Sequence, residues 1–378
     1  MNFNLSDDAA MVKDSAARYL KDKSTGAAVK EMICSEEGYA RNLWKEIAEL
    51  GWLGYVYDEK YGGSSGSFLN LFIIFEQMGK CLLPSPFFPS CVLSGFLIAE
   101  AGSDQMKSAW LPGVIRGEAV LTTALLDEEG NCDCDDPLLK AKETKEGRYV
   151  IDGVRILVPY VNIASDIIVC ANVSGSPDGA NGPTLFMVNK QSPGVQATLL
   201  NTMTEAKKYA VTFSQVACTR ENVIGEFGKG SFYINKILPR AIALRCGEML
   251  GGLERVCDMT VAYMKEREQF GGPLGRLEVV QHYCADLATY LETARLLAYQ
   301  AAANLSAGRP SLEEVYMAKA WLSDCYKNAT WIAHQLHGAV GFAAEHDLHL
   351  YYRHAKELEL EFGDSVVFRQ KVADEMGI

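Results

Sequence analysis

The sequence predicts an α+β fold in which an N-terminal helical domain, a middle β-domain and a C-terminal four-helix bundle follow one another. Three observations predict this order. Apolar side chains recur at helical spacing through residues 1–118, short runs of β-branched and aromatic residues fill residues 119–228, and long helical patterns return through residues 229–378. We expect the chain to divide into domains at these boundaries.

The N-terminal region contains several separate helical patterns. Residues 7–21 suit one amphipathic helix, and residues 42–53 carry an apolar stripe that is interrupted at Gly51, a typical helix stop. Residues 68–83 and 91–101 are apolar on most of their surface. Such helices are typical of a layer that is packed against a larger core.

The middle region reads as strands separated by Gly, Asp, Asn and Pro. The runs are AVLTTALL (119–126), GRYVIDGVRILVPY (147–160), SDIIVCANV (165–173), PTLFMVN (183–189) and YAVTFSQVAC (209–218). Their short length and their content of β-branched and aromatic residues predict a small sandwich or barrel.

The last third returns to helices. Long helical stretches at 232–270, 278–307, 311–337 and 347–375 are separated by short breaks rich in glycine. Short connections favour antiparallel neighbours, so these stretches predict a helical bundle.

Composition excludes several classes of function. The 378-residue chain is 48% hydrophobic and carries a formal net charge of −12, which argues against nucleic acid and anionic membrane surfaces as partners. No apolar run is long enough to span a bilayer. The eleven cysteines are scattered without a C-x-x-C pair, and the chain begins without a basic-then-apolar leader. We therefore expect reduced thiols and a cytoplasmic location.

Four strings together resemble signature segments of the acyl-CoA dehydrogenase family of flavoenzymes. They are LWKEIAELGWLGYVYDEKYGG (43–63), REQFGGPLG (267–275), HQLHGAVGF (334–342) and EHDLHLYYRHAK (345–356). The resemblance covers essentially the whole chain and implies the acyl-CoA dehydrogenase fold. It also implies FAD-dependent oxidation of an acyl-CoA to the 2-enoyl-CoA in lipid or carboxylic acid catabolism. An electron-transferring flavoprotein would be the acceptor, and the assembly would be a tetramer.

Glu248 is the catalytic base that the resemblance implies. In the commonest branch of the family the base lies near the C-terminus, but Phe362 stands at that position here. The string CGEMLG (246–251) instead resembles a bacterial branch with its base on the first bundle helix, and Glu248 fills that place. Glu361, adjacent to the usual position, is the back-up candidate.

The neighbours of Glu248 admit two interpretations. Gly251 and Gly252 lie three and four positions away on one helical face, where the absence of side chains would leave room for a ligand. Alternatively, Glu248 forms an i−3 salt bridge with Arg245 and the glycines serve helix packing.

The resemblance also implies cofactor-binding residues. Arg267 would pair with the FAD pyrophosphate, Phe270 would pack near the adenine, and Gln335 and Gly338 would meet the adenosine and pyrophosphate region. The alternative role for Arg267 is a cation at a helix C-terminus, where it complements the helix dipole.

The histidines do not predict a metal site. His282, His337, His346 and His349 are not arranged as a helical-face pair with a carboxylate, and no H-E-x-x-H motif exists. We interpret them as structural and expect no metal.

Two departures from the family pattern leave other functions open. Residues 123–131 retain little of the family's flavin-facing loop, and residues 275–282 lack its usual Phe-Gln pair. Some members of the bacterial branch resembled here are heterotetramers of two related chains. The chain could therefore be a homo- or heterotetrameric dehydrogenase, a degenerate partner subunit that completes another chain's FAD site, or a related enoyl-CoA reductase.

Overall fold

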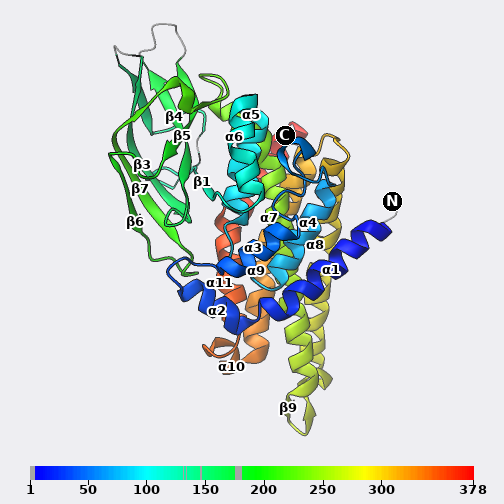
Figure 1. The fold of residues 1–378 in the computed structure, drawn as a ribbon. Coiled ribbons are helices and arrows are strands. Elements are labelled where there is room, and N and C mark those ends of the chain that lie inside the picture. The colour runs from blue at the N-terminus through cyan, green and yellow to red at the C-terminus, as the bar shows by residue number, and fades with distance from the viewer. Residues whose placement is uncertain (1–4, 131, 133, 145–146, 175–180) are drawn as a thin grey trace. The chain divides into compact units, whose positions relative to one another are not determined.

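The computed structural model describes residues 5–130, 132, 134–144, 147–174 and 181–378 (Figure 1). The described chain forms two compact units. The bundle unit comprises residues 5–30, Ser67–Leu83 and Pro239–Ile378, and the sheet unit comprises Glu31–Gly66 and Pro84–Leu238. The three-domain division at residues 118 and 228 stays a prediction.

The α-helices account for both the N-terminal and C-terminal helical regions. They are α1 (Asp7–Lys23), α2 (Gly26–Cys34), α3 (Arg41–Glu49), α4 (Phe68–Lys80), α5 (Gly95–Ala101), α6 (Asp104–Ile115), α7 (Gly230–Glu266), α8 (Glu278–Ser306), α9 (Leu312–His337), α10 (Ala339–Phe342), α11 (Leu348–Leu360) and α12 (Ser365–Met376). Shorter turns are η1 (Glu59–Tyr61), the wider π-type helix η2 (Phe88–Ser94), η3 (Arg220–Asn222) and η4 (Leu274–Arg276).

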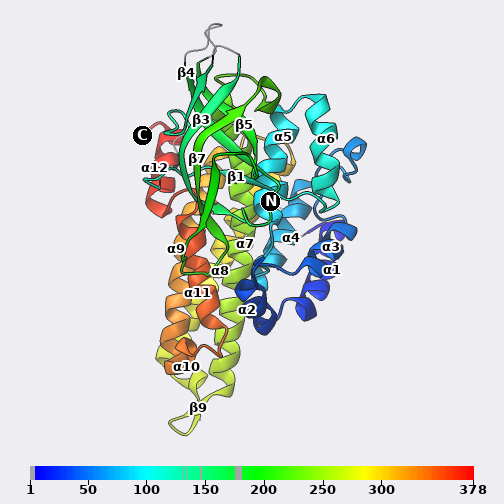
Figure 2. The same ribbon diagram turned by 60° about the vertical axis from the view of Figure 1, so that its left-hand side comes forward.

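The C-terminal bundle is confirmed, with a correction at its end. Helices α7, α8, α9 and α11 run alongside one another in Figures 1 and 2. The pattern at 347–375 forms two helices instead of one, because Phe362 and Gly363 adopt positive φ angles of 63° and 114°. Such angles cannot continue a right-handed helix. The resulting turn carries Glu361.

The first bundle helix ends earlier than its pattern predicts. It stops at Glu266, and the next residues pair as strands β9 (Glu268–Gln269) and β10 (Gly272–Pro273). Phe270 and Gly271, with φ angles of 53° and 83°, make the tight turn between them. This hairpin connects the C-terminal end of α7 to the start of α8 and lies at the bottom of both views.

A buried carboxylate ties the N-terminal helices to the bundle. Glu76 of α4 is fully buried and accepts from Lys13 Nζ at 3.1 Å, Tyr299 Oη at 2.5 Å and Arg295 Nη1 at 3.4 Å. These partners come from α1 and α8. A carboxyl group is tolerated in a protein interior only when it is paired and hydrogen-bonded. The three partners therefore account for the burial of the Glu76 side chain, which joins α4 to α1 and α8.

The middle region forms one eight-stranded sheet with the order β6-β7-β3-β2-β4-β5-β8, and β1 pairs with β4. The strands are β1 (Leu121–Ala124), β2 (Lys140–Glu143), β3 (Tyr149–Pro159), β4 (Asp166–Ser174), β5 (Gly182–Asn189), β6 (Val195–Leu199), β7 (Lys208–Cys218) and β8 (Val223–Ile224). All five predicted runs are strands, whereas β2, β6 and β8 were not expected. The sequence of β2 is short and polar, so it gives little indication of a strand.

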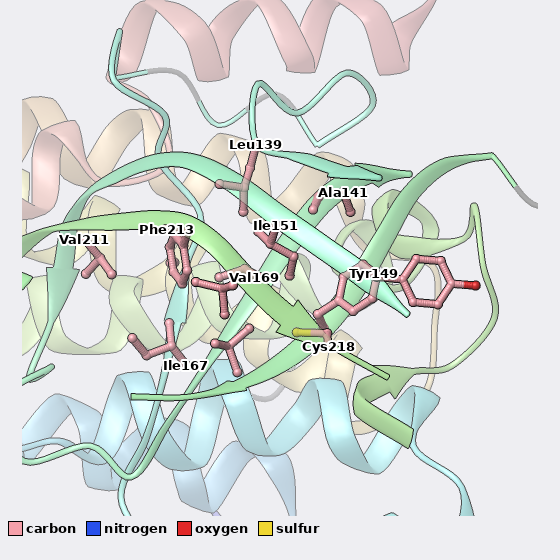
Figure 3. Packing of buried hydrophobic residues seen from close by; sticks show 14 of the residues in the cluster. Leu139, Ala141, Tyr149, Ile151, Ile167, Val169, Val211, Phe213 and Cys218 are labelled. Atoms are coloured by element: carbon pink, nitrogen blue, oxygen red, sulfur yellow. The ribbon is translucent and has the colours of Figure 1, made fainter. Parts of the chain in front are cut away.

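The sheet encloses its own apolar core. Figure 3 shows Ile151 of β3, Val169 of β4 and Phe213 of β7 pointing toward one another, and all three are at most 1% exposed. Along β4, the alternate residues Ile167, Val169, Ala171 and Val173 all belong to this cluster, as the period of two predicts.

The cysteines are free thiols at all eleven positions, and most are buried. Burial raises the pKa of Cys246 and of Cys257 to about 12.

Over the described residues, no helix combines the length and apolarity that a membrane crossing requires.

Candidate active site

Glycines let α7 cross α4 at close range. A Cβ on Gly251 would lie 1.8 Å from the backbone oxygen of Glu76, and one on Gly247 would lie 2.9 Å from that of Phe72. A Cβ on Gly79 of α4 would in turn lie 1.9 Å from the backbone oxygen of Glu248. The helix-packing interpretation is therefore confirmed, and the expectation that Gly251 leaves room for a ligand is wrong. The crossing instead fixes the backbone that carries Glu248.

Glu248 is held between two nitrogen groups. Its Oε2 lies 2.5 Å from Arg245 Nη1, the i−3 salt bridge anticipated as an alternative, and its Oε1 lies 3.0 Å from His354 Nε2. Its side chain is 14% exposed. Burial alone would raise the pKa of this carboxyl, but the Arg245 charge and the His354 hydrogen bond outweigh burial and lower that pKa to about 2.

Glu361 meets the same guanidinium. Its Oε2 lies 2.8 Å from Arg245 Nε and its Oε1 lies 3.2 Å from Arg245 Nη2. Burial would lower the pKa of Arg245, but the charges of Glu361 and Glu248 raise it above its ordinary value. The structure thus brings both candidate bases of the sequence onto one arginine.

A buried lysine holds the turn that carries Glu361. Lys319 of α9 is fully buried, and its Nζ donates to the backbone oxygens of Glu359 and Gly363, each at 3.0 Å, and to Ser323 Oγ at 3.1 Å. Burial lowers the pKa of Lys319 to about 8. The three hydrogen bonds satisfy this ammonium and fix both ends of the turn.

Two residues of the cluster escaped the sequence analysis. His354 on α11 contacts Glu248, and Tyr326 on α9 places its Oη 3.2 Å from His354 Nδ1. His354 precedes Glu361 by seven residues, a spacing that places both on one helical face. That signal was present, but the sequence does not tell which residues of α7 and α9 this face meets.

The cofactor-binding candidates gather where α7 and α9 end. The N–H of Arg267 donates to the backbone oxygen of Tyr263 at 2.8 Å, and the Tyr263 ring stacks on His337 with centroids 4.5 Å apart. His337 directly precedes Gly338, so the stack brings the Arg267 end of α7 beside Gly338. Gln335 lies on the last turn of α9 and has an exposed side chain.

These candidates fit the phosphate and adenine end of FAD. Arg267 is exposed, Phe270 is 78% exposed, and a Cβ added at Gly338 would meet nothing within 4 Å. A guanidinium, an uncovered aromatic ring and an accessible backbone are the groups that a dinucleotide diphosphate needs. Their roles stay predictions.

One further segment singled out in the sequence lies partly outside the described residues. The predicted flavin-facing loop is described up to Gly130, and Asn131 lies beyond the described residues. Where the structure describes the chain, no three His, Cys, Asp or Glu side chains come together as a metal site.

The cluster as a whole is suited to moving one proton. Glu248 is an ionised acceptor, Arg245 keeps a second carboxylate partner in Glu361, and His354 contacts the other oxygen of Glu248. Protonation of Glu248 would therefore leave Arg245 paired, which avoids the large cost of an isolated buried charge.

Comparisons with known proteins cover both helical regions. A model of the acyl-CoA dehydrogenase N-terminal domain matches residues 6–118, and a model of the acyl-CoA dehydrogenase C-terminal domain matches residues 228–377. The mitochondrial short/branched chain specific acyl-CoA dehydrogenase of Rattus norvegicus is 30% identical over 324 residues, which cover 84% of this chain and 74% of that protein.

Two further similarities span the whole chain. The acryloyl-CoA reductase (NADH) of Anaerotignum propionicum is 26% identical over 381 residues, which cover 100% of this chain and 96% of that protein. A chain of the ChsE4-ChsE5 complex from Mycobacterium tuberculosis matches with a TM-score of 0.89 and 25% identity, over 100% of this chain and 99% of that one.

Proposed function

Because the chain belongs to the acyl-CoA dehydrogenase family, we propose that Glu248 removes the α-proton of an acyl-CoA thioester as it is oxidised to the 2-enoyl-CoA. The chain is an oxidoreductase with the fold expected from its sequence, and FAD is its cofactor. When bound, FAD would supply the acceptor for the hydride that leaves the β-carbon of the thioester.

The observation that carries this proposal is the position of the Glu248 carboxylate between Arg245 and His354. A carboxylate with a pKa of about 2 is ionised at neutral pH and therefore able to accept a proton. A base is most effective when its pKa lies near the operating pH, so proton transfer requires the Arg245 contact to weaken. Glu361 supports this step because it keeps Arg245 paired.

In this assignment Glu248 is the base, and Glu361 holds Arg245 in place. Both Glu361 oxygens lie within 3.2 Å of Arg245, and the turn that carries Glu361 is held by Lys319. Arg267, Phe270, Gln335 and Gly338 are proposed to hold FAD, by the exposure and backbone access described above.

Flavin bleaching tests the base assignment. Purified chain with bound FAD is mixed anaerobically with acyl-CoA thioesters, and the loss of visible absorbance is followed. Glu248→Gln should keep the flavin spectrum and lose substrate-dependent bleaching, whereas Glu361→Gln should still bleach. The exposed Glu226→Gln is a matched control. Normal bleaching by Glu248→Gln, with its loss in Glu361→Gln, would move the assignment to Glu361.

Two alternatives have support of their own. Similarity to an acryloyl-CoA reductase favours testing the reverse reaction, by supplying a 2-enoyl-CoA to the reduced flavin. Similarity to a chain of a two-component complex favours testing a heterotetramer in which this chain completes another's FAD site. A chain that is colourless alone and yellow only with a related partner would support that second alternative.

We propose an electron-transferring flavoprotein as acceptor and a homo- or heterotetramer as the assembly, both on the strength of the family. A cytoplasmic location stays a prediction from the sequence.

A further inference from the structure

His354 connects the proposed base to a buried tyrosine. Its Nε2 lies 3.0 Å from Glu248 Oε1 and its Nδ1 lies 3.2 Å from Tyr326 Oη. The three side chains come from α11, α7 and α9, so the contact depends on all three helices. His354 is 16% exposed and Tyr326 is fully buried.

The partners of His354 determine its tautomer. An ionised carboxylate only accepts hydrogen bonds, so Nε2 must carry the proton and donate to Glu248. Nδ1 is then an acceptor, and Tyr326 Oη–H is its donor. Burial raises the pKa of Tyr326 well above its ordinary value, which keeps this hydroxyl protonated as the arrangement requires.

Gly252 makes room for the tyrosine. A Cβ at Gly252 would lie 2.2 Å from Tyr326 Oη and 2.5 Å from Tyr326 Cζ. Because Tyr326 is enclosed, a side chain at position 252 would force its hydroxyl away from His354. The space beside Gly252 is therefore filled by Tyr326, whereas the sequence led us to expect a ligand there.

We propose that His354, oriented by Tyr326, is a positioning residue that holds Glu248 ready to act and disables this base when the imidazole becomes protonated. This inference rests on the proposed function of Glu248. In the proton-transfer step the α-C–H bond breaks and a Glu248 O–H bond forms, and His354 neither gains nor loses a proton. Separately, a proton from solvent can add to Nδ1, which ends its acceptance from Tyr326.

The electrostatic consequence follows from the groups around the imidazole. Among the described residues, the charged or titratable side chains around this cluster include Glu248 and Arg245 of α7, Tyr326 of α9, Tyr351 and Glu361 of α11 and the turn after it, and Cys81 after α4. An imidazolium would add a second positive charge beside Glu248 and reduce its affinity for the α-proton. The rate of proton removal should fall as His354 becomes charged.

Two substitutions separate this role from simple packing. His354→Gln can still donate to Glu248 through its amide but cannot titrate. Tyr326→Phe removes the donor to Nδ1, so the imidazole should accept a proton more readily. The two variants should therefore change the acid limb of the pH profile in opposite directions.

The experiment measures the single-turnover rate of acyl-CoA-dependent flavin bleaching in the holoenzyme against pH. The wild type should show an acid limb. His354→Gln should lose that limb, and Tyr326→Phe should move it to higher pH by roughly half to one unit, the equivalent of one hydrogen bond. His282→Gln, on the exposed surface of α8, should keep the wild-type profile.

A second readout does not depend on turnover. In chain labelled with ¹⁵N-histidine, the imidazole of His354 should give the Nε2–H tautomer, and Tyr326→Phe should raise the pH at which it titrates. An unchanged bleaching profile in folded, flavin-bound His354→Gln would overturn the inference, as would the Nδ1–H tautomer. The Glu248→Gln variant separates failure of this inference from failure of the proposed function. Normal bleaching in Glu248→Gln would contradict the role of Glu248 as the base, independently of any result for His354.

Discussion

Arg245 Nη1 lies 2.5 Å from Glu248 Oε2 and belongs to a guanidinium that also contacts Glu361. One largely buried cation, 16% exposed, thus serves two carboxylates that are 113 residues apart in the sequence, the difference between positions 361 and 248. The pairing joins the middle of α7 to the turn after α11. It accounts for the ionised state of Glu248 and for the stability of a site that contains two acidic groups.

Removal of Arg245 should destabilise the chain strongly. Arg245→Met leaves Glu248 and Glu361 without their shared counter-ion, and breaking a buried pair from one side typically costs about 3–5 kcal/mol. The free energy of unfolding from denaturant titration measures this loss. The exposed Arg309→Met is the control and should change stability by less than about 0.5 kcal/mol. Equal stability of the two variants would contradict the shared pairing.

Glu248 should contribute to stability in a pH-dependent way. Its folded pKa of about 2 lies below that of an unfolded glutamate, about 4.3, so the folded state binds fewer protons between these values. The stabilisation is present above about pH 4.3 and is lost as the pH falls toward 2.

The comparison of wild type with Glu248→Gln checks this sign. The wild type should be more stable by about 3 kcal/mol at pH 7, and the difference should shrink between about pH 4.3 and 2. Urea titrations across this range measure it, with exposed Glu226→Gln as a control that shows no such trend. A difference that grows toward low pH would mean that Glu248 is protonated in the folded chain.

Gly251→Ala should disrupt the crossing of α4 and α7. The added methyl would lie 1.8 Å from the backbone oxygen of Glu76, which cannot move without shifting α4. Although alanine favours helix by about 1 kcal/mol, the overpacking should lower the free energy of unfolding by about 1–3 kcal/mol.

The control for this prediction is Gly113→Ala on α6. Its Cβ would meet only the Ala119 side chain, at 3.3 Å. Thermal unfolding of both variants measures the contrast, and a stabilised Gly251→Ala would show that the helices separate easily at this point.

Arg267→Gln should weaken flavin retention. A guanidinium that pairs with a phosphate contributes about 1.5–3 kcal/mol, so the dissociation constant of FAD should rise about tenfold to a hundredfold. Flavin fluorescence during dialysis or titration measures this constant. Arg309→Gln is again the control, and unchanged FAD affinity in Arg267→Gln would leave Arg267 with its alternative role at the helix C-terminus.

Residue type and spacing were sufficient for much of the fold. The short apolar run at residues 165–173, rich in β-branched side chains, predicted the almost continuously buried strand β4. The helical patterns of 278–307 and 311–337 predicted α8 and α9, because the buried face of a helix follows its period. The break at Phe362 and Gly363 was missed although glycine is a typical helix stop, because a single glycine inside a helical pattern does not by itself show where a helix ends. Only the surrounding packing, with Lys319 holding both ends of the turn, selects the positive φ angles.

The sequence by itself determined the family, the order of helix and strand, and a short set of carboxylates and arginines. The tertiary structure decided which of these meet. Arg245 could be paired with Glu248 by helical spacing, but Glu361, His354 and Tyr326 join the cluster only because α7, α9 and α11 pack against one another. The same holds for Gly251 and Gly252. Sequence shows that their side chains are absent, whereas only the packed helices show that α4 and Tyr326 fill that space.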